Sequence, residues 1–276
     1  MQTNPHPIGD AFGTALRSWR ESRKMSQLEL ALCATVSQRH VSWLENGRSA
    51  PSREMVVRLC VALDVPLRER NVLLASAGFT GVYAQNDLDD PTMAPVRRAL
   101  EYTLEHHNPY PALVADRHWN LRLTNAAMDR LLQLAGDPQA MFDKVGDDGQ
   151  RNLARLTLHP QGLRPLIGNW DDAAPMFLNR LRCEAMSYGS AADVERVKEL
   201  AALADLPAGA GSDMAQPLLP TLPLVLELGT LRLSLFSVIS TFGTAQDVTA
   251  DELRIETFYP ADEDSDALLR QTAGAT

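Results

Sequence analysis

The feature that most constrains this chain is "SQLELALCATVSQRHVSWLENGR", residues 26–48. Ser26 is a preferred helix N-cap, and Glu29 three residues later completes a capping box for the helix "QLELALCA". A three-residue turn then leads to Ser37, which caps a second helix that ends before Gly47. Two short capped helices joined by so tight a turn predict a helix-turn-helix, and any fold of this region must accommodate that unit.

Amphipathic segments surround this pair on both sides. Phe12, Leu16 and Arg20 recur at helical spacing in a run that ends near residue 24. Ser52 caps "REMVVRLCVALD", and "PLRERNVLLASAGF" closes on Gly78. We therefore expect five helices with short connections in residues 1–80.

Charge is distributed unevenly along the 276 residues, whose formal net charge is −9. Residues 1–80 hold ten Lys and Arg against seven Asp and Glu, whereas residues 81–276 hold sixteen against twenty-eight. A locally basic head can bind phosphate while the acidic remainder is repelled by it. Three widely spaced cysteines argue against a disulfide framework, and the chain shows neither a leader pattern nor a long apolar run. A cytoplasmic protein without a membrane partner is expected.

The helix after Ser37 presents two different faces on a helical wheel. Val41 and Leu44 mark an inner face, and the polar side chains project opposite them. Arginine donates well to guanine, and glutamine or asparagine pairs with adenine. The outer residues are Arg39, Ser42, Trp43 and Asn46, with Gln38 at the flank.

Residues 12–64 resemble the Cro/C1-type (XRE) helix-turn-helix family, through "SQLELA" and "VSQRHVSWLENGR" in order and spacing. The resemblance implies operator DNA as a partner. It implies a phosphate clamp at Gln27, base reading by Gln38, Arg39 and Trp43, backbone contacts by Asn46 and Arg48, and an ion pair between Arg20 and Glu45. Trp43 replaces a residue that is often polar, so an apolar contact or packing is expected there. The predicted DNA-contacting set is Gln27, Ser37, Gln38, Arg39, Ser42, Trp43, Asn46 and Arg48.

The chain changes character after residue 80. The polar stretch 81–93 is predicted to be a linker, residues 94–265 a second domain and residues 266–276 a tail. Two short strands are expected in "PALVADRHWNLRLTN", and further strands in 222–228, in 231–242 and in "ELRIETFYP". Helices are expected between the first two strands and residue 222. This order predicts an α+β domain with an antiparallel sheet and flanking helices behind the helical N-terminal domain.

No catalytic motif stands out in the second domain. HExxH, GxSxG, P-loop and CxxC patterns are absent from the sequence, and "GAGSDM" at 209–214 is no dinucleotide loop. The histidines do not share one helical face at ligand spacing, so no metal site, no cofactor and no enzymatic activity are expected. Two alternatives stay open: an enzyme with an autoregulatory DNA-binding head, and an antitoxin-like interaction protein.

Residues 94–264 resemble the ligand-binding domain of MmyB-like transcription regulators, through "PALVADRHWNLRLTNAAMDRLL", "RNLARLTLHPQGLRPLIGNW" and "ISTFGTAQDVTADELRIETFYPADE". The resemblance implies a PAS-like domain that binds a small apolar, fatty-acid-like ligand. Such a ligand needs apolar walls and a cationic or hydroxyl anchor. The expected walls are Trp119, Leu121, Leu235, Phe236, Val238 and Phe242. The candidate anchors are Tyr102, Arg164, Arg180 and Arg182.

Together these patterns predict a sequence-specific transcription regulator whose second domain senses an apolar ligand. One recognition helix reads only half of a two-fold operator, so a homodimer is expected. The ligand would shift operator affinity through its different affinities for two arrangements of the protein.

Overall fold

The computed structural model describes residues 7–146, 149–206 and 221–273. The chain divides into two compact units. The first unit comprises residues 1–86 and 244–251, and the second unit comprises residues 87–243 and 252–276. Within the described ranges, no helix is both long and apolar enough to cross a bilayer.

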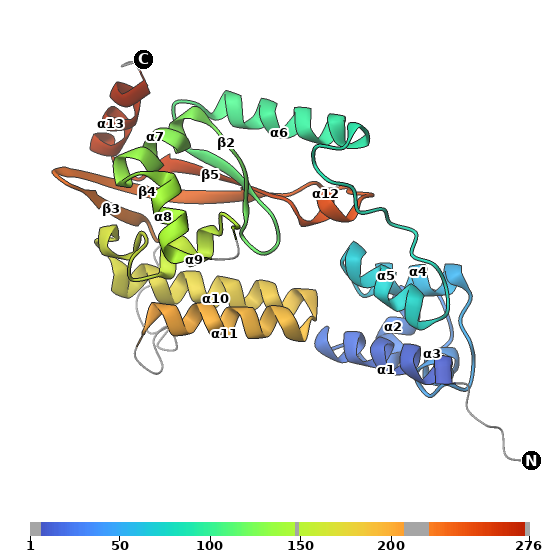
Figure 1. Cartoon of the computed structure of the whole chain (residues 1–276). Coiled ribbons are helices and arrows are strands. Elements are labelled where there is room, and N and C mark those ends of the chain that lie inside the picture. The colour runs from blue at the N-terminus through green and yellow to red at the C-terminus, as the bar shows by residue number, and fades with distance from the viewer. Residues whose placement is uncertain (1–6, 147–148, 207–220, 274–276) are drawn as a thin grey trace, which may run out of the picture. The chain divides into compact units, whose positions relative to one another are not determined.

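The helices of the first unit follow the predicted order (Figure 1). They are α1 (Pro7–Ser22), α2 (Gln27–Cys33), α3 (Gln38–Glu45), α4 (Arg53–Ala62) and α5 (Leu67–Ser76). The prediction of a helical N-terminal domain with a helix-turn-helix is confirmed. Its core is a single apolar cluster that includes Phe12, Leu16, Leu30, Val41, Leu44, Leu59 and Leu74.

Local hydrogen bonds fix the two helices of the helix-turn-helix. The Ser26 side chain accepts from the Glu29 amide at 3.2 Å, and the Glu29 carboxylate accepts from the Ser26 amide at 2.6 Å. The Ser37 hydroxyl accepts from the amide of His40 at 3.1 Å. Gly13 lets α1 approach the end of α3, because a Cβ at this position would lie 2.6 Å from the Leu44 carbonyl oxygen.

The second unit contains an antiparallel five-stranded sheet in the order β2-β1-β5-β4-β3. The strands are β1 (Ala112–Ala115), β2 (Leu121–Thr124), β3 (Leu224–Leu228), β4 (Leu231–Ser240) and β5 (Arg254–Pro260). The helices are α6 (Ala94–His107), α7 (Ala126–Ala135), α8 (Pro138–Val145), α9 (Leu153–Leu158), α10 (Trp170–Tyr188), α11 (Ala191–Ala204) and α13 (Glu263–Ala273). The predicted α+β class with an antiparallel sheet and flanking helices is confirmed.

The two faces of the sheet pack against different helices (Figure 1). On β1, Leu113 and Ala115 join the large cluster that also contains side chains of α7 to α11. Ala112 and Val114 join a smaller cluster with Leu100 of α6. This alternation follows the two-residue period of a strand, so β1 is buried on both sides.

Three segments differ from the predicted boundaries. Residues 266–273, assigned to the predicted tail over 266–276, belong to α13, and Leu269 packs into the large cluster. Residues 81–86 of the predicted linker lie in the first unit, where the Asn71 side chain binds the backbone of Val82 and Tyr83. Residues 244–251 also lie in the first unit, and they include most of α12 (Val248–Glu252). The motif "GAGSDM" lies outside the described residues.

Candidate DNA-binding face and ligand cavity

The outer face of α3 is free of core packing. Val41 and Leu44 are completely buried, which turns the opposite side of the helix to solvent. On that side, Ser42 is half-buried and the other predicted contact residues of the helix region are exposed: Ser37, Gln38, Arg39, Trp43, Asn46 and Arg48.

Two side chains of this face interact with each other. The Arg39 guanidinium lies 4.4 Å from the centroid of the Trp43 ring, at cation–π distance. An arginine held on an aromatic face samples fewer rotamers than a free one, so less entropy is lost when it binds a base. The structure therefore brings Arg39 and Trp43 together, with the indole in a packing role.

Glu45 is a fully buried carboxylate at the end of α3. Arg20 of α1 donates to it twice, from Nε to Oε1 at 2.6 Å and from Nη2 to Oε2 at 3.0 Å. Gln27 of α2 donates from Nε2 to Oε2 at 2.8 Å. Burial alone would raise the pKa of Glu45, but the hydrogen bonds from Arg20 and Gln27 outweigh it and hold the pKa below its ordinary value. One carboxylate thus ties together the three helices that orient the outer face of α3.

The residues predicted to contact the DNA backbone differ in how far they are already bonded within the protein. Asn46 donates from Nδ2 to the Ser42 carbonyl oxygen at 2.7 Å, and its Oδ1 accepts from Arg17 Nη2 at 2.9 Å. Its amide is thus already engaged within the protein. Arg48 is exposed just beyond α3, and Gln27 keeps a second amide hydrogen beside the one it gives to Glu45.

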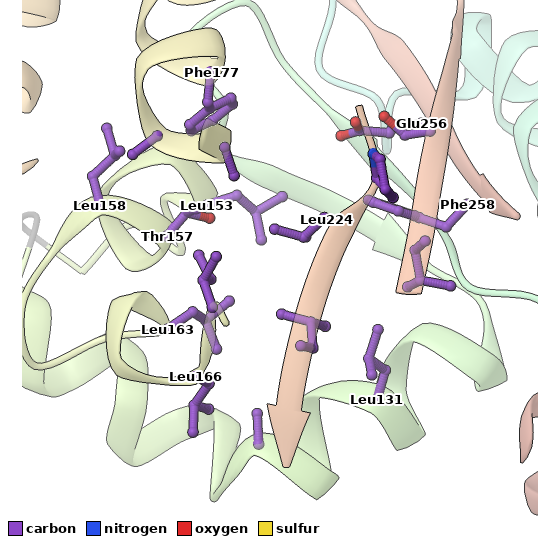
Figure 2. Close-up of a pocket in the computed structure, with 18 of the residues that line it drawn as sticks. Leu131, Leu153, Thr157, Leu158, Leu163, Leu166, Phe177, Leu224, Glu256 and Phe258 are labelled. Carbon is purple, nitrogen blue, oxygen red and sulfur yellow. The ribbon is translucent and has the colours of Figure 1, made fainter. Parts of the chain in front are cut away.

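The second unit contains a cavity of about 360 Å³. Figure 2 shows leucines and Phe177 around it, with Glu256 and Phe258 of β5 on one side. Its polar side chains, apart from the two tryptophans, are Thr157, Arg180, Ser237 and Glu256. The apolar lining includes Leu113, Trp119, Met128, Leu131, Leu153, Leu163, Leu166, Ile167, Trp170, Ala173, Phe177, Leu224, Leu226, Leu235 and Phe258.

One face of α10 and one face of β4 form walls of this cavity. On α10, Trp170, Ala173 and Phe177 recur at spacings of three and four residues, so they share a helical face. On β4, Leu235 and Ser237 reach the cavity. Phe236 points to the other side of the strand, where it packs against Tyr259 at a ring distance of 5.4 Å.

Arg180 sits at the polar part of the lining. Its Nε donates to Glu184 Oε1 at 3.2 Å, and its Nη1 donates to Glu256 Oε1 at 3.3 Å. The guanidinium lies 4.5 Å from the centroid of Trp119, whose Nε1 donates to Glu184 Oε2 at 3.0 Å. Nη2 of Arg180 is buried and has no hydrogen-bond partner among the described residues. A buried unsatisfied donor is costly, so this atom suits a ligand acceptor.

Trp119 is held in an unusual backbone conformation. Its φ is +67°, in the left-handed region that side chains other than glycine rarely adopt. The turn is closed by Asp116, whose carboxylate accepts from the amides of His118 and Asn120 at 2.9 and 3.0 Å. Strain of this kind is concentrated at functional sites, and here it aims an indole at the cavity.

The predicted ligand residues divide into two groups. Trp119, Leu235 and Arg180 line the cavity. The remaining candidates do not: Tyr102 and Val238 are exposed, Arg182 is exposed, Arg164 covers Trp170 from outside the lining, and Leu121, Phe236 and Phe242 pack elsewhere. Their assignment to the cavity lining is corrected. On β4 the physical reason is alternation, since Phe236 and Val238 lie on the opposite side from Leu235 and Ser237.

Sequence reasoning missed the α10 wall and Glu256. The α10 residues carry a readable signal, since Trp170, Ala173, Phe177 and Arg180 recur at i, i+3, i+7 and i+10. Glu256 carries none, because an acidic residue in the middle of a strand reads as an exposed position until the partner strands are known.

A second buried ion cluster lies at the β1–β2 turn. The Arg117 side chain is 5 % exposed and donates from Nη1 to Glu252 Oε1 at 3.0 Å and from Nη2 to Asp193 Oδ2. Burial alone would raise the pKa of Asp193, but hydrogen bonds from His118 and the charge of Arg117 hold the pKa below its usual value. The cluster ties the turn that carries Trp119 to α11 and to Glu252, two residues before β5.

Comparisons with known proteins agree with this arrangement. Residues 96–271 match the family described as MmyB-like transcription regulator ligand binding domain, and residues 11–73 match a helix-turn-helix domain. The transcriptional regulator ClgR of Mycobacterium tuberculosis is 35 % identical over 71 residues, 26 % of this chain and 61 % of that protein. The chain thus spans less than two thirds of the length of this curated relative.

Two solved structures of one regulator are similar to part of the chain. A crystal structure of the clp gene regulator ClgR from C. glutamicum is 34 % identical, covers 26 % of this chain and 88 % of its own, and has a TM-score of 0.23. A second structure of this regulator, from Corynebacterium glutamicum, is 28 % identical, covers 38 % and 99 %, and has a TM-score of 0.24. The match over residues 96–271, behind a helix-turn-helix domain at residues 11–73, shows that the chain belongs to the family with an MmyB-like transcription regulator ligand-binding domain.

Proposed function

We propose that this regulator senses a fatty-acid-like molecule in the cavity of its second unit and binds operator DNA as a homodimer through the outer face of α3. The observation that carries the ligand proposal is the buried Nη2 of Arg180, which has no hydrogen-bond partner among the described residues, in a mostly apolar cavity. A volume of about 360 Å³ falls within the range of small-molecule sites. An acyl chain suits the leucine-rich walls, and its head group accepts the free hydrogen of Arg180.

The charges around Arg180 restrict the head group further. Arg254 Nη1 donates to Glu184 Oε2 at 2.6 Å, so two arginines and two glutamates already face one another here. One additional acceptor satisfies the free donor, whereas a polyanionic ligand would meet the repulsion of Glu184 and Glu256. A nucleotide or a sugar phosphate therefore fits poorly, and a single carboxyl, hydroxyl or carbonyl group fits well.

The ligand proposal is tested by extraction and titration. Native mass spectrometry of the protein purified from its host, followed by solvent extraction, identifies whatever remains bound. Calorimetric titration of delipidated protein with saturated fatty acids, from decanoic to hexadecanoic acid, measures affinity. Binding of these acids and of their matching alcohols supports the cavity assignment. Absence of binding by both series contradicts it.

Filling the cavity is expected to abolish this binding. Ala173→Trp places an indole inside the lining, so the affinity for the fatty acids should fall by at least about tenfold, which corresponds to 1.4 kcal/mol. Ala192→Trp on an exposed position of α11 is the matched control and should bind like the unmodified protein. Equal affinities of the two variants, measured by the same titration, would show that the ligand binds elsewhere.

Arg39 is expected to determine operator specificity. Arg39→Ala should lower affinity for the selected operator by about 1–3 kcal/mol, because a bidentate contact to one base is lost. Affinity for random duplex DNA should change little. The control is Arg58→Ala, an exposed arginine of α4 away from the α3 face. Fluorescence anisotropy with an operator selected from random DNA gives both affinities, and equal losses on both DNAs would remove Arg39 from the base-reading set.

The homodimer is proposed from operator symmetry alone. Sedimentation of the protein with one operator duplex counts the bound chains, and two per duplex are expected. The antitoxin-like alternative calls for a flat second domain, and the cavity disfavours it.

A further inference from the structure

The chain between β4 and β5 belongs to the DNA-binding unit, although both strands belong to the ligand-binding unit. β4 ends at Ser240, β5 begins at Arg254, and residues 244–251 between them cluster with residues 1–86. We call residues 244–251 the tether. The sequence places it between two predicted strands but carries no signal that it belongs to the first unit.

Specific hydrogen bonds hold the tether within the first unit. Asp247 Oδ2 accepts from the amide of Asn86 at 3.2 Å and from its Nδ2 at 2.9 Å. The amide of Val248 donates to the Ala84 carbonyl oxygen at 2.8 Å. Val248 and Ala250 are almost fully buried, at 1 % and 3 % exposed. The tether is therefore a packed, hydrogen-bonded part of the first unit and not an exposed loop.

One contact of the tether completes a helix of the DNA-binding unit. The amide of Leu67, the first residue of α5, donates to Asp251 Oδ2 at 3.0 Å. The N-cap position of α5 is Pro66, which has no side-chain acceptor and makes no capping bond. Asp251 supplies the acceptor and a negative charge favourable at a helix N-terminus. The tether thus supplies the acceptor for the first amide of α5.

Both strands that the tether joins line the ligand cavity. Leu235 and Ser237 of β4 and Glu256 and Phe258 of β5 belong to the lining, and Ser237 is paired directly with Phe258. A molecule in the cavity therefore contacts the two strands whose connecting chain caps α5.

The polar part of the cavity is bonded to the residues that follow the tether. Arg180 binds Glu184, and Glu184 Oε2 accepts from Arg254 Nη1, the first residue of β5. Glu252, directly after the tether, accepts from Arg117. A ligand acceptor that draws Arg180 away from Glu184 therefore changes the bonding of Arg254, three residues after Asp251.

We propose that the tether couples occupancy of the cavity to operator affinity, with Asp247 and Asp251 as its attachment points in the DNA-binding unit. This inference rests on the proposed ligand and DNA functions. Coupling requires that the ligand bind more tightly to one arrangement of the tether than to another, and allosteric couplings of this kind are typically about 5- to 150-fold.

The test separates coupling from binding. Dodecanoic acid affinity is measured by calorimetry, and affinity for a selected operator by anisotropy with and without saturating dodecanoic acid. The double variant Asp247→Asn, Asp251→Ala is compared with the unmodified chain and with Asp264→Asn, an exposed carboxylate in the first turn of α13. Asn at 247 still caps α12 through Oδ1, but its amide group opposes the Asn86 donors.

The expected result is a change in operator affinity of at least about fivefold on ligand addition in the unmodified chain and in the control. In the double variant this ratio should fall below twofold, while affinity for dodecanoic acid stays unchanged. The proposal is overturned if dodecanoic acid changes operator affinity as much in the double variant as in the unmodified chain. It is also overturned if dodecanoic acid binds the unmodified chain without changing its operator affinity.

A second perturbation works whether or not dodecanoic acid binds. Ser237→Phe places a ring at the cavity wall on β4 and acts as a permanent occupant. Its effect on operator affinity should disappear when it is combined with the double variant. If dodecanoic acid does not bind, but the effect of Ser237→Phe still disappears in the combined variant, the ligand class is wrong and the coupling stands. An effect that persists in the combined variant rejects the tether as the route.

Discussion

Arg20→Ala is expected to lower the free energy of unfolding of the first unit by about 3–5 kcal/mol, the range found when one partner of a buried ion pair is removed. The Glu45 carboxylate is inaccessible to solvent and would lose two of the donors that compensate its charge. Its remaining side-chain donors are then the neutral Gln27, at 2.8 Å, and the partly exposed Arg17, at 3.4 Å. Since total stabilities are commonly 5–15 kcal/mol, so large a loss should also abolish operator binding at moderate temperature.

The matched control for this variant is Arg17→Ala. Arg17 also approaches Glu45, at 3.4 Å, but its side chain is 43 % exposed. Its removal should cost no more than about 1 kcal/mol. Amide hydrogen exchange of the α1, α2 and α3 backbone reports the opening of the first unit without interference from the second. Similar protection from amide exchange in the two variants would show that burial of the Arg20–Glu45 ion pair does not determine its contribution to stability.

Lowering the pH should narrow the difference in the free energy of unfolding between Arg20→Ala and the unmodified protein. The pKa of Glu45 is lowered in the native protein, so its contribution is complete above the unfolded-state pKa of about 4.3 and is lost as pH falls through the folded value. Without Arg20, burial dominates and the pKa rises, so the variant regains stability once Glu45 is protonated. The difference at pH 7 should therefore exceed the difference at pH 4. An equal difference at both values would contradict the ion-pair explanation.

Arg117→Ala should have the second large effect, lowering the free energy of unfolding of the second unit by about 3–5 kcal/mol. It leaves the Glu252 and Asp193 carboxylates, each 9 % exposed, without the guanidinium between them. The loss should reach the cavity as well, because this cluster anchors the turn that carries Trp119. Fatty-acid affinity is expected to fall together with stability.

The control for Arg117 is His118→Ala at the same turn. His118 also binds Asp193, from Nε2 to Oδ1 at 3.0 Å, but its side chain is 35 % exposed. Its removal should change stability by no more than about 1 kcal/mol and leave ligand affinity unchanged. Exchange protection in β1, β2 and α11, together with the calorimetric titration, distinguishes the two variants. If Arg117→Ala changes the free energy of unfolding only slightly, water replaces the guanidinium at little cost in stability.

The helix-turn-helix was predictable because its determinants are local. Each cap, from Ser26 or Ser37 to the amide three residues on, lies within one helical turn of sequence. The buried positions Val41 and Leu44 follow from the helical period alone. Such short-range rules need no knowledge of the rest of the fold, and the outer face of α3 follows from them by exclusion.

The cavity was predictable only as a class of site. Alternation in β4 separates Leu235 and Ser237 from Phe236 and Val238, but it does not say which set meets α10. Both sets are largely apolar, so composition could not decide. The choice depends on the side of the sheet that α7 to α11 cover, which is set by contacts far apart in the sequence.

By itself, the sequence determined the capped helices, the recognition face, the strands and the separation of a basic head from an acidic remainder, because each depends on neighbours within a few residues. Only the tertiary structure decided which residues surround the cavity and that residues 244–251 belong to the first unit. The bonds that Asn86 donates to Asp247 and Leu67 donates to Asp251 join residues 161 and 184 positions apart. No periodicity or cap encodes a partner at such a distance, since it is selected by the packing of the whole chain.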